Sequence, residues 1–156
     1  MKISESPSTI TARLQQKIAG RLRQKGVKPT SIRELVFKIL LSNQHPVSLA
    51  ELESQLETID KSTIFRTLSL FEQHHLVHAF EDGSGSLKYE ACPNPYECLL
   101  EDQHIHFYCT GCKKTLCIPS KQIPLVELPK GFAMQSVNYT IKGFCPTCSK
   151  SAEKRI

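Results

Sequence analysis

Apolar residues recur at helical spacing through the first half of this 156-residue chain. The first stripe, in segment 8–26, consists of Ile10, Leu14, Ile18 and Leu22. Residues four apart share one face of a helix, and the Gly26 that follows is typical of a helix end. Three further helices are predicted. Thr30 or Ser31 can cap the first of these, whose apolar stripe is Ile32, Val36 and Ile39. The capping box "SLAE" begins the second, which continues through Leu52 and Leu56. The third is "DKSTIFRTLSLFEQHH", with Ile64, Leu68 and Phe71 on one stripe.

The pattern changes to strands after residue 75. "LVHAFEDGSGSLKYEAC" has two β-rich runs around a glycine-rich turn, which predicts a two-stranded wing and, with the helices, a winged helix-turn-helix domain over 1–90. The prolines of "CPNPYE" predict a linker over 91–101. Strand-like "HIHFYC", "KTLCIP" and "SVNYTIKGF", with "SKQIPLVELP" as a short helix or loop, predict a small αβ domain over 102–150 and a tail over 151–156. The expected fold class is α+β.

Positive charge is concentrated at the start of the chain. The net charge is +5, but residues 1–40 hold nine Lys or Arg against two Glu, which favours a polyanionic partner. In a winged helix the second helix of the motif enters the DNA major groove, and here that is 62–74. The alternative is that its exposed residues only decorate a solvated face. The predicted DNA contacts are Lys28, Thr30, Arg33, Ser62, Thr63, Phe65 and Arg66.

Four of the seven cysteines form two CxxC pairs, "CTGC" and "CPTC". Cys109, Cys112, Cys145 and Cys148 suit a tetrahedral zinc ion, and a closed set of four thiolates indicates a structural site. A redox CxxC pair is the alternative, but it has no use for the second motif. A domain this small needs such a staple.

The same region contains "HIHFYC", in which His104 and His106 share one face of a strand. We expect Ile105 and Phe107 to point into the core instead. A HxH pair on a strand is typical of two ligands to one metal ion. The four cysteines fill the structural site, so a second metal is predicted, with two more ligands from elsewhere.

Other function classes fit less of the chain. It has no run of 18 apolar residues and no apolar signal region, so we expect a cytoplasmic protein without a membrane partner. An enzyme would need the His/Cys cluster to hold an open zinc site, but neither a clear general base nor a nucleophile motif accompanies it, so no enzymatic activity is expected. A zinc-ribbon interaction module would leave the winged helix and the HxH pair without a role.

Together these motifs resemble the ferric uptake regulator family of metal-sensing transcription factors. "STIFRTLSLFEQHHLV" is similar to the family's recognition helix, "HIHFYCTGCKK" to its histidine and first CxxC block, and "GFCPTC" to its second. The resemblance implies a homodimer, a DNA-binding domain followed by a dimerisation domain, and metal-dependent repression of metal-uptake genes at a palindromic operator.

Matching residues one by one favours the zinc-sensing branch of that family. The resemblance implies a regulatory site of His78, Cys92, His104 and His106, with Glu90, Cys98 and Cys117 as alternatives. Cys117 stands where the family has an acidic residue, and softer ligands favour Zn²⁺ over Fe²⁺ or Mn²⁺. An iron-, manganese- or peroxide-responsive regulator stays open. Phe65 replaces the usual tyrosine, and His45 is one position off a family histidine, so its role is open.

Overall fold

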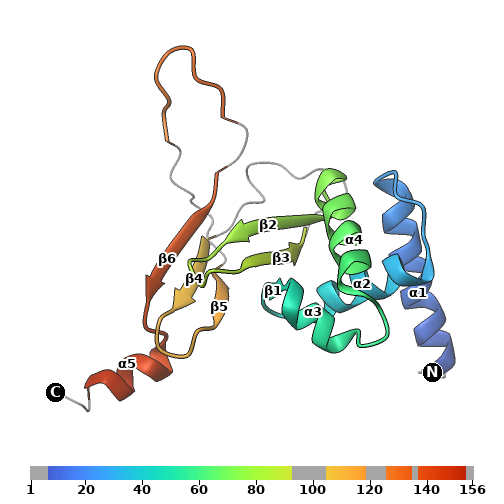
Figure 1. Cartoon of the computed structure of the whole chain (residues 1–156), viewed down its shortest axis with the longest axis horizontal. Helices are drawn as coiled ribbons and strands as arrows, with labels where there is room; N and C mark the ends of the chain where they lie inside the picture. Colours follow the sequence, from blue (N-terminus) through green and yellow to red (C-terminus); the bar gives the residue numbers. More distant parts are fainter. Residues whose placement is uncertain (1–6, 93–104, 119–125, 135–136, 154–156) are drawn as a thin grey trace, which may run out of the picture.

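The computed structural model describes residues 7–92, 105–118, 126–134 and 137–153. Four helices and a small sheet form the N-terminal part, and a second sheet with one helix forms the C-terminal part (Figure 1). The helices are α1 (Pro7–Gln24), α2 (Ser31–Ser42), α3 (Leu49–Gln55), α4 (Lys61–Gln73) and α5 (Pro146–Glu153). The strands are β1 (Val47–Ser48), β2 (Val77–Glu81), β3 (Leu87–Ala91), β4 (Ile105–Cys109), β5 (Thr115–Ile118) and β6 (Tyr139–Gly143). The α+β class is confirmed.

The predicted caps fix where the N-terminal helices begin. The Thr30 side chain accepts a hydrogen bond from the Arg33 amide at the start of α2. Ser48 and Glu51 form the reciprocal capping box of α3, with 3.2 and 2.6 Å between donor and acceptor atoms. Each cap satisfies amide donors that a helix start leaves open. Asp60 caps α4 in the same way.

The N-terminal core contains the stripe predicted for α4, since Ile64, Leu68 and Phe71 are fully buried. The stripe predicted for α2 is correct in part: Val36 is buried and Ile39 is partly buried against the core, but Ile32 is exposed. Phe37 and Leu40 are the other buried residues of this helix. Phe37 meets Phe71 edge to face at 5.5 Å between ring centroids, which rotates α2 onto α4.

The wing has three strands, not the predicted two. Its order is β1-β3-β2, all antiparallel, because Val47 and Ser48 pair with Tyr89 and Lys88. This strand is only two residues long, so it carries no alternating pattern that a sequence reading would detect. Figure 1 shows β2 and β3 reaching from the helices toward the C-terminal sheet.

The C-terminal sheet has β4 at its centre, antiparallel to β5 and parallel to β6. The burial expected along β4 is wrong: His106 and Tyr108 are each 6 % exposed, whereas Ile105 and Phe107 are half-buried. The wing covers the His106 face of β4, since the Phe80 ring stacks on His106. Residues 126–129 end the segment expected as a short helix or loop, and they form no regular structure. The helix α5 was not predicted.

No helix in the described ranges is long and apolar enough to cross a membrane.

Candidate metal centres

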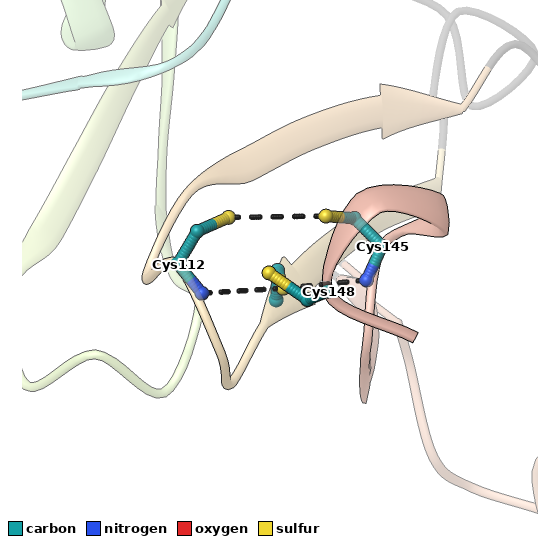
Figure 2. A group of neighbouring side chains, drawn as sticks. Cys112, Cys145 and Cys148 are labelled. Carbon is teal, nitrogen blue, oxygen red and sulfur yellow. Dashed lines mark hydrogen bonds between the residues drawn. The ribbon is translucent and has the colours of Figure 1, made fainter. Parts of the chain in front are cut away.

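The four paired cysteines converge at the end of the C-terminal sheet. Cys109 ends β4, Cys112 lies in the turn after it, and Cys145 and Cys148 lie at the start of α5. Their sulfur atoms all lie within 4.8 Å of one another. Figure 2 shows the sulfurs of Cys112 and Cys145 facing each other, at 3.9 Å. Tetrahedral zinc with Zn–S bonds of about 2.3 Å requires sulfurs about 3.8 Å apart, so the group fits a Cys₄ ion.

Backbone amides prepare this cluster for thiolate. The amides of Cys112 and Cys145 donate to Cys109 Sγ at 3.5 and 3.3 Å. These two hydrogen bonds lower the pKa of Cys109 to about 6. Close contact with Cys145, followed by burial, raises the pKa of Cys148 to about 12. In a cluster of thiols this close together, a bound cation would stabilise the deprotonated thiolate form of each cysteine.

A second group of potential ligands lies between the wing and the C-terminal sheet. Glu90 of β3, His106 of β4 and Cys117 of β5 place their ligand atoms within 4.8 Å of one another. His106 Nε2 lies 3.1 Å from Glu90 Oε2, and the Cys117 thiol donates to Glu90 Oε1 at 2.7 Å. Within the described residues these are the two groups of three or more such side chains. Glu90 and the other two residues come from opposite sides of the predicted linker.

In this second group His106 is buried, whereas Glu90 and Cys117 are partly buried. His106 and Cys117 are paired across the antiparallel β4–β5 ladder, so their side chains share a face. Burial, and then the Glu90 carboxylate, raises the pKa of the Cys117 thiol well above its ordinary range. The Phe80 ring stacks on the imidazole of His106 with 3.5 Å between ring centroids, which fixes the ring plane. A bound cation would replace the Cys117 proton and bring these ligands together.

The other residues predicted for the regulatory site are placed differently. His78 pairs with Glu90 across β2 and β3, so both belong to one face of the wing, but His78 is not in the group of three. Cys92 is buried against α1, where its carbonyl accepts a hydrogen bond from Arg21. His104 and Cys98 lie outside the described residues. His45 is exposed and belongs to neither group.

The residues predicted to touch DNA gather between α2 and α4. Thr30, Arg33, Thr63 and Arg66 line one groove of about 260 Å³. Phe65 has 49 % of its surface exposed, and Lys28 and Ser62 are also exposed. The Lys28 carbonyl accepts a hydrogen bond of 2.8 Å from the Arg33 guanidinium, which places both residues on this surface.

Sequence reasoning missed the part that Asp60 plays on this surface. Its carboxylate accepts from the hydroxyls of Ser62 and Thr63 and from the Thr63 amide. These bonds lower the pKa of Asp60 to about 2. Because both hydroxyls donate their protons to Asp60, only their oxygen lone pairs are available to an external partner. The signal in the sequence was an acidic residue directly before a helix.

The model of the ferric uptake regulator family matches residues 24–140. The chain belongs to this family. Its members are metal-responsive transcription regulators and not enzymes, and they bind DNA as dimers. The resemblance first seen in the motifs is thereby confirmed, and so are the expected winged-helix and αβ parts of the fold.

Individual relatives agree with the family. The chain is 31 % identical over 143 residues to the ferric uptake regulation protein of Campylobacter jejuni, covering 85 % of this chain and 87 % of that protein. The protein of the same name from Synechococcus elongatus is 28 % identical over 145 residues, covering 86 % and 94 %.

Solved structures share the fold at low identity. A zinc uptake regulator complexed with zinc and DNA has a TM-score of 0.65 at 16 % identity, covering 96 % of this chain and 99 % of that one. The Helicobacter pylori ferric uptake regulator, described with three functional metal-binding sites, has a TM-score of 0.56 at 19 % identity, covering 96 % and 97 %.

Proposed function

We propose that this Fur-family regulator is a zinc-responsive repressor whose regulatory ion is bound between the wing and the C-terminal sheet. The observation that carries the proposal is the convergence of Glu90, His106 and Cys117 from three strands on both sides of the linker. An ion there would fix the orientation of the winged helix relative to the rest of the protomer. The Cys₄ group would hold a separate, structural zinc ion within one domain.

The choice of zinc is supported by the ligand atoms. A thiolate and an imidazole are softer than the all-oxygen sets that suit Mn²⁺, and the Irving–Williams order places Zn²⁺ above Fe²⁺ and Mn²⁺. A fourth ligand would complete a tetrahedron, for which His104 is the candidate by sequence. The Glu90 carboxylate favours the alternative of an iron- or manganese-responsive regulator. The set of His78, Cys92, His104 and His106 is the other arrangement for zinc.

DNA recognition is assigned to α4 and the groove beside it. Arg33, Arg66 and Lys28 supply positive charge for phosphates or for guanine, and Phe65 can contact a thymine methyl. Because Asp60 engages the hydroxyls of Ser62 and Thr63, these residues can accept from base amino groups but not donate to phosphates. In a homodimer the two α4 helices would read a palindromic operator upstream of zinc-uptake genes, in the cytoplasm.

The partner surface of the dimer is assigned to the C-terminal part. Exposed large apolar side chains occur there on strands and loops: Leu116, Ile118, Val126, Leu128, Phe132, Met134, Ile141 and Phe144. Apolar surface of this extent on one small domain is typical of an interface between subunits. Metal binding then selects a dimer whose two α4 helices have the spacing of the operator, with a coupling of about 1 to 3 kcal/mol in a typical allosteric case.

The test is metal-dependent DNA binding by ligand variants. A duplex is first selected from a random-sequence pool by zinc-loaded wild-type protein, and its affinity is then measured after mild chelation and addition of Zn²⁺, Fe²⁺ or Mn²⁺. Cys117→Ser should abolish the zinc response while keeping one tight ion per chain, and Cys92→Ser, the matched control, should respond as the wild type does.

Each other outcome assigns the site differently. If Cys92→Ser loses the zinc response but Cys117→Ser keeps it, the regulatory ligands are His78, Cys92, His104 and His106 instead of the proposed set. Restoration by Fe²⁺ or Mn²⁺ at concentrations where Zn²⁺ fails would reject zinc sensing. If no metal changes the affinity, the regulatory site itself is rejected.

A further inference from the structure

The tip of the wing carries a buried carboxylate that no metal group contains. Asp82 follows β2 and is 0 % exposed. Its Oδ2 accepts a hydrogen bond from the hydroxyl of Thr115, the first residue of β5, and its Oδ1 accepts from the Ser84 amide at 2.8 Å. Thr115 is also buried, at 4 % exposed. A buried carboxylate is costly unless it is hydrogen-bonded, so the Thr115 hydroxyl is a required partner.

This hydrogen bond joins the same two surfaces as the proposed regulatory site. Thr115 and Cys117 alternate along β5 and therefore project to one face, toward the wing. On the wing, Phe80 and Asp82 are likewise two residues apart and both buried. The Phe80 ring stacks on the imidazole of His106.

Further contacts at the wing tip place it against the C-terminal sheet. The far end of the Lys142 side chain on β6 lies against Gly83, at 2.2 Å from the place of a Cβ atom there, and Gly83 has φ of +83°. The Thr140 hydroxyl donates to the carbonyl of Glu81 at 3.5 Å, an exposed and weaker contact. Burial acts to raise the pKa of Asp82, but hydrogen bonds from Ser84 and Thr115 and the charge of Lys88 outweigh it and lower the pKa. Asp82 is therefore a charged acceptor at this contact.

We propose that the Thr115–Asp82 hydrogen bond is a metal-independent latch that holds the wing against the C-terminal sheet and sets Glu90 opposite His106 and Cys117. Asp82 and Thr115 are then positioning residues for the regulatory ion. This inference rests on the proposed function, in which Glu90, His106 and Cys117 bind that ion. Neither residue is a ligand. The latch lowers the ordering cost of metal binding, because the two domains already face each other before the ion arrives.

The experiment compares Thr115→Val, which keeps the side-chain shape and removes the hydroxyl, with Thr115→Ser, which restores it. Thr140→Val is the matched control, since it alters the exposed contact at the same interface. Two quantities are measured on protein that retains its tight metal: the Co²⁺ affinity of the labile site, and amide hydrogen exchange of the wing and β5 in the absence of labile metal. Thr115→Val should weaken Co²⁺ binding roughly tenfold or more. It should also speed exchange in residues 80–87 and 115–118.

Thr115→Ser and Thr140→Val should match the wild type in both measurements. Unchanged exchange in Thr115→Val overturns the latch, whatever happens to Co²⁺. Faster exchange with unchanged Co²⁺ affinity keeps the hydrogen bond as a contact between the two domains but overturns its positioning role. The proposed ligand set fails separately, if Cys117→Ser binds Co²⁺ as the wild type does. If Thr115→Val loses its tight metal through unfolding, Asp82→Asn takes its place, and exchange unchanged in that variant also overturns the latch.

Discussion

Two phenylalanines on α4 have opposite surroundings, and we expect each to have a distinct role. Phe71 is fully buried and packs edge to face on Phe37, whereas Phe65 is 49 % exposed. Phe71→Ala should lower the free energy of unfolding by about 3 to 5 kcal/mol, through lost burial and the cavity left behind. Phe65→Ala should change it by less than about 0.5 kcal/mol and weaken operator binding instead. Urea denaturation and DNA titration of both variants check this, and equal stability losses would contradict it.

Cys145 tests the proposed structural metal site, in which we expect each ligand to be needed for the stability of the small C-terminal domain. Cys145→Ser should remove the tight metal ion, whose binding free energy in small metal domains is on the order of 10 kcal/mol and is folding free energy. The C-terminal sheet should unfold and dimers should be lost. Metal analysis and sedimentation measure the two effects. Thr147→Ala, an exposed position between the two cysteines, is the control. A Cys145→Ser protein that stays dimeric with normal melting would reject the structural site.

At the scale of the element, α4 depends on its first turn. Hydrogen bonds from Ser62 and Thr63 lower the pKa of Asp60 to about 2, below its value near 4 in an unfolded chain. A group with a depressed folded pKa stabilises the folded state above the unfolded pKa and loses that effect as pH falls through the folded one. We therefore expect the cap to persist at neutral pH and to be lost between about pH 4 and pH 2. A carboxyl NMR titration measures this directly, and a midpoint near 4 would contradict it.

Replacing the cap tests the same element at neutral pH. Asp60→Ala should expose the first amides of α4, release the two hydroxyls and lower operator affinity, while Glu57→Ala on the preceding turn should leave it unchanged. Wild-type affinity in Asp60→Ala would show that the hydroxyls of Ser62 and Thr63 are not oriented by the cap.

Elements with strong local signals were predictable, and those set by tertiary contact were not. The Ser48 capping box and the buried stripe of α4 are encoded within a few residues, so both were predicted correctly. β1 exists only because Val47 meets Tyr89, and α2 is rotated by the contact of Phe37 with Phe71. The Cys₄ group followed from its spacing. The contact between Glu90 and Cys117 depends on the relative orientation of the two domains, which the spacing of residues along the sequence does not encode.

For the whole molecule, the exposed apolar side chains of the C-terminal part predict where subunits meet. Ile141 on β6 is 48 % exposed and Phe144 is 54 % exposed. Ile141→Asp should dissociate the dimer, because a charge would be buried in the interface, and operator affinity should fall with it. Leu14→Asp, at a similarly exposed position on α1, should stay dimeric. Sedimentation equilibrium of both variants decides this, and a dimeric Ile141→Asp protein would place the interface elsewhere.

The parallel pairing of β4 with β6 has a consequence for how the chain folds. Parallel neighbours need a long crossover connection between them. Such distant pairings form slowly, because the entropy of loop closure is lost before the stabilising contacts form. The helices of the N-terminal part are built from local contacts and should form first. An ion that joins the end of β4 to the start of α5 closes the same crossover. We therefore expect metal supply to set the rate at which newly made chains become competent to dimerise, before any regulatory ion is sensed.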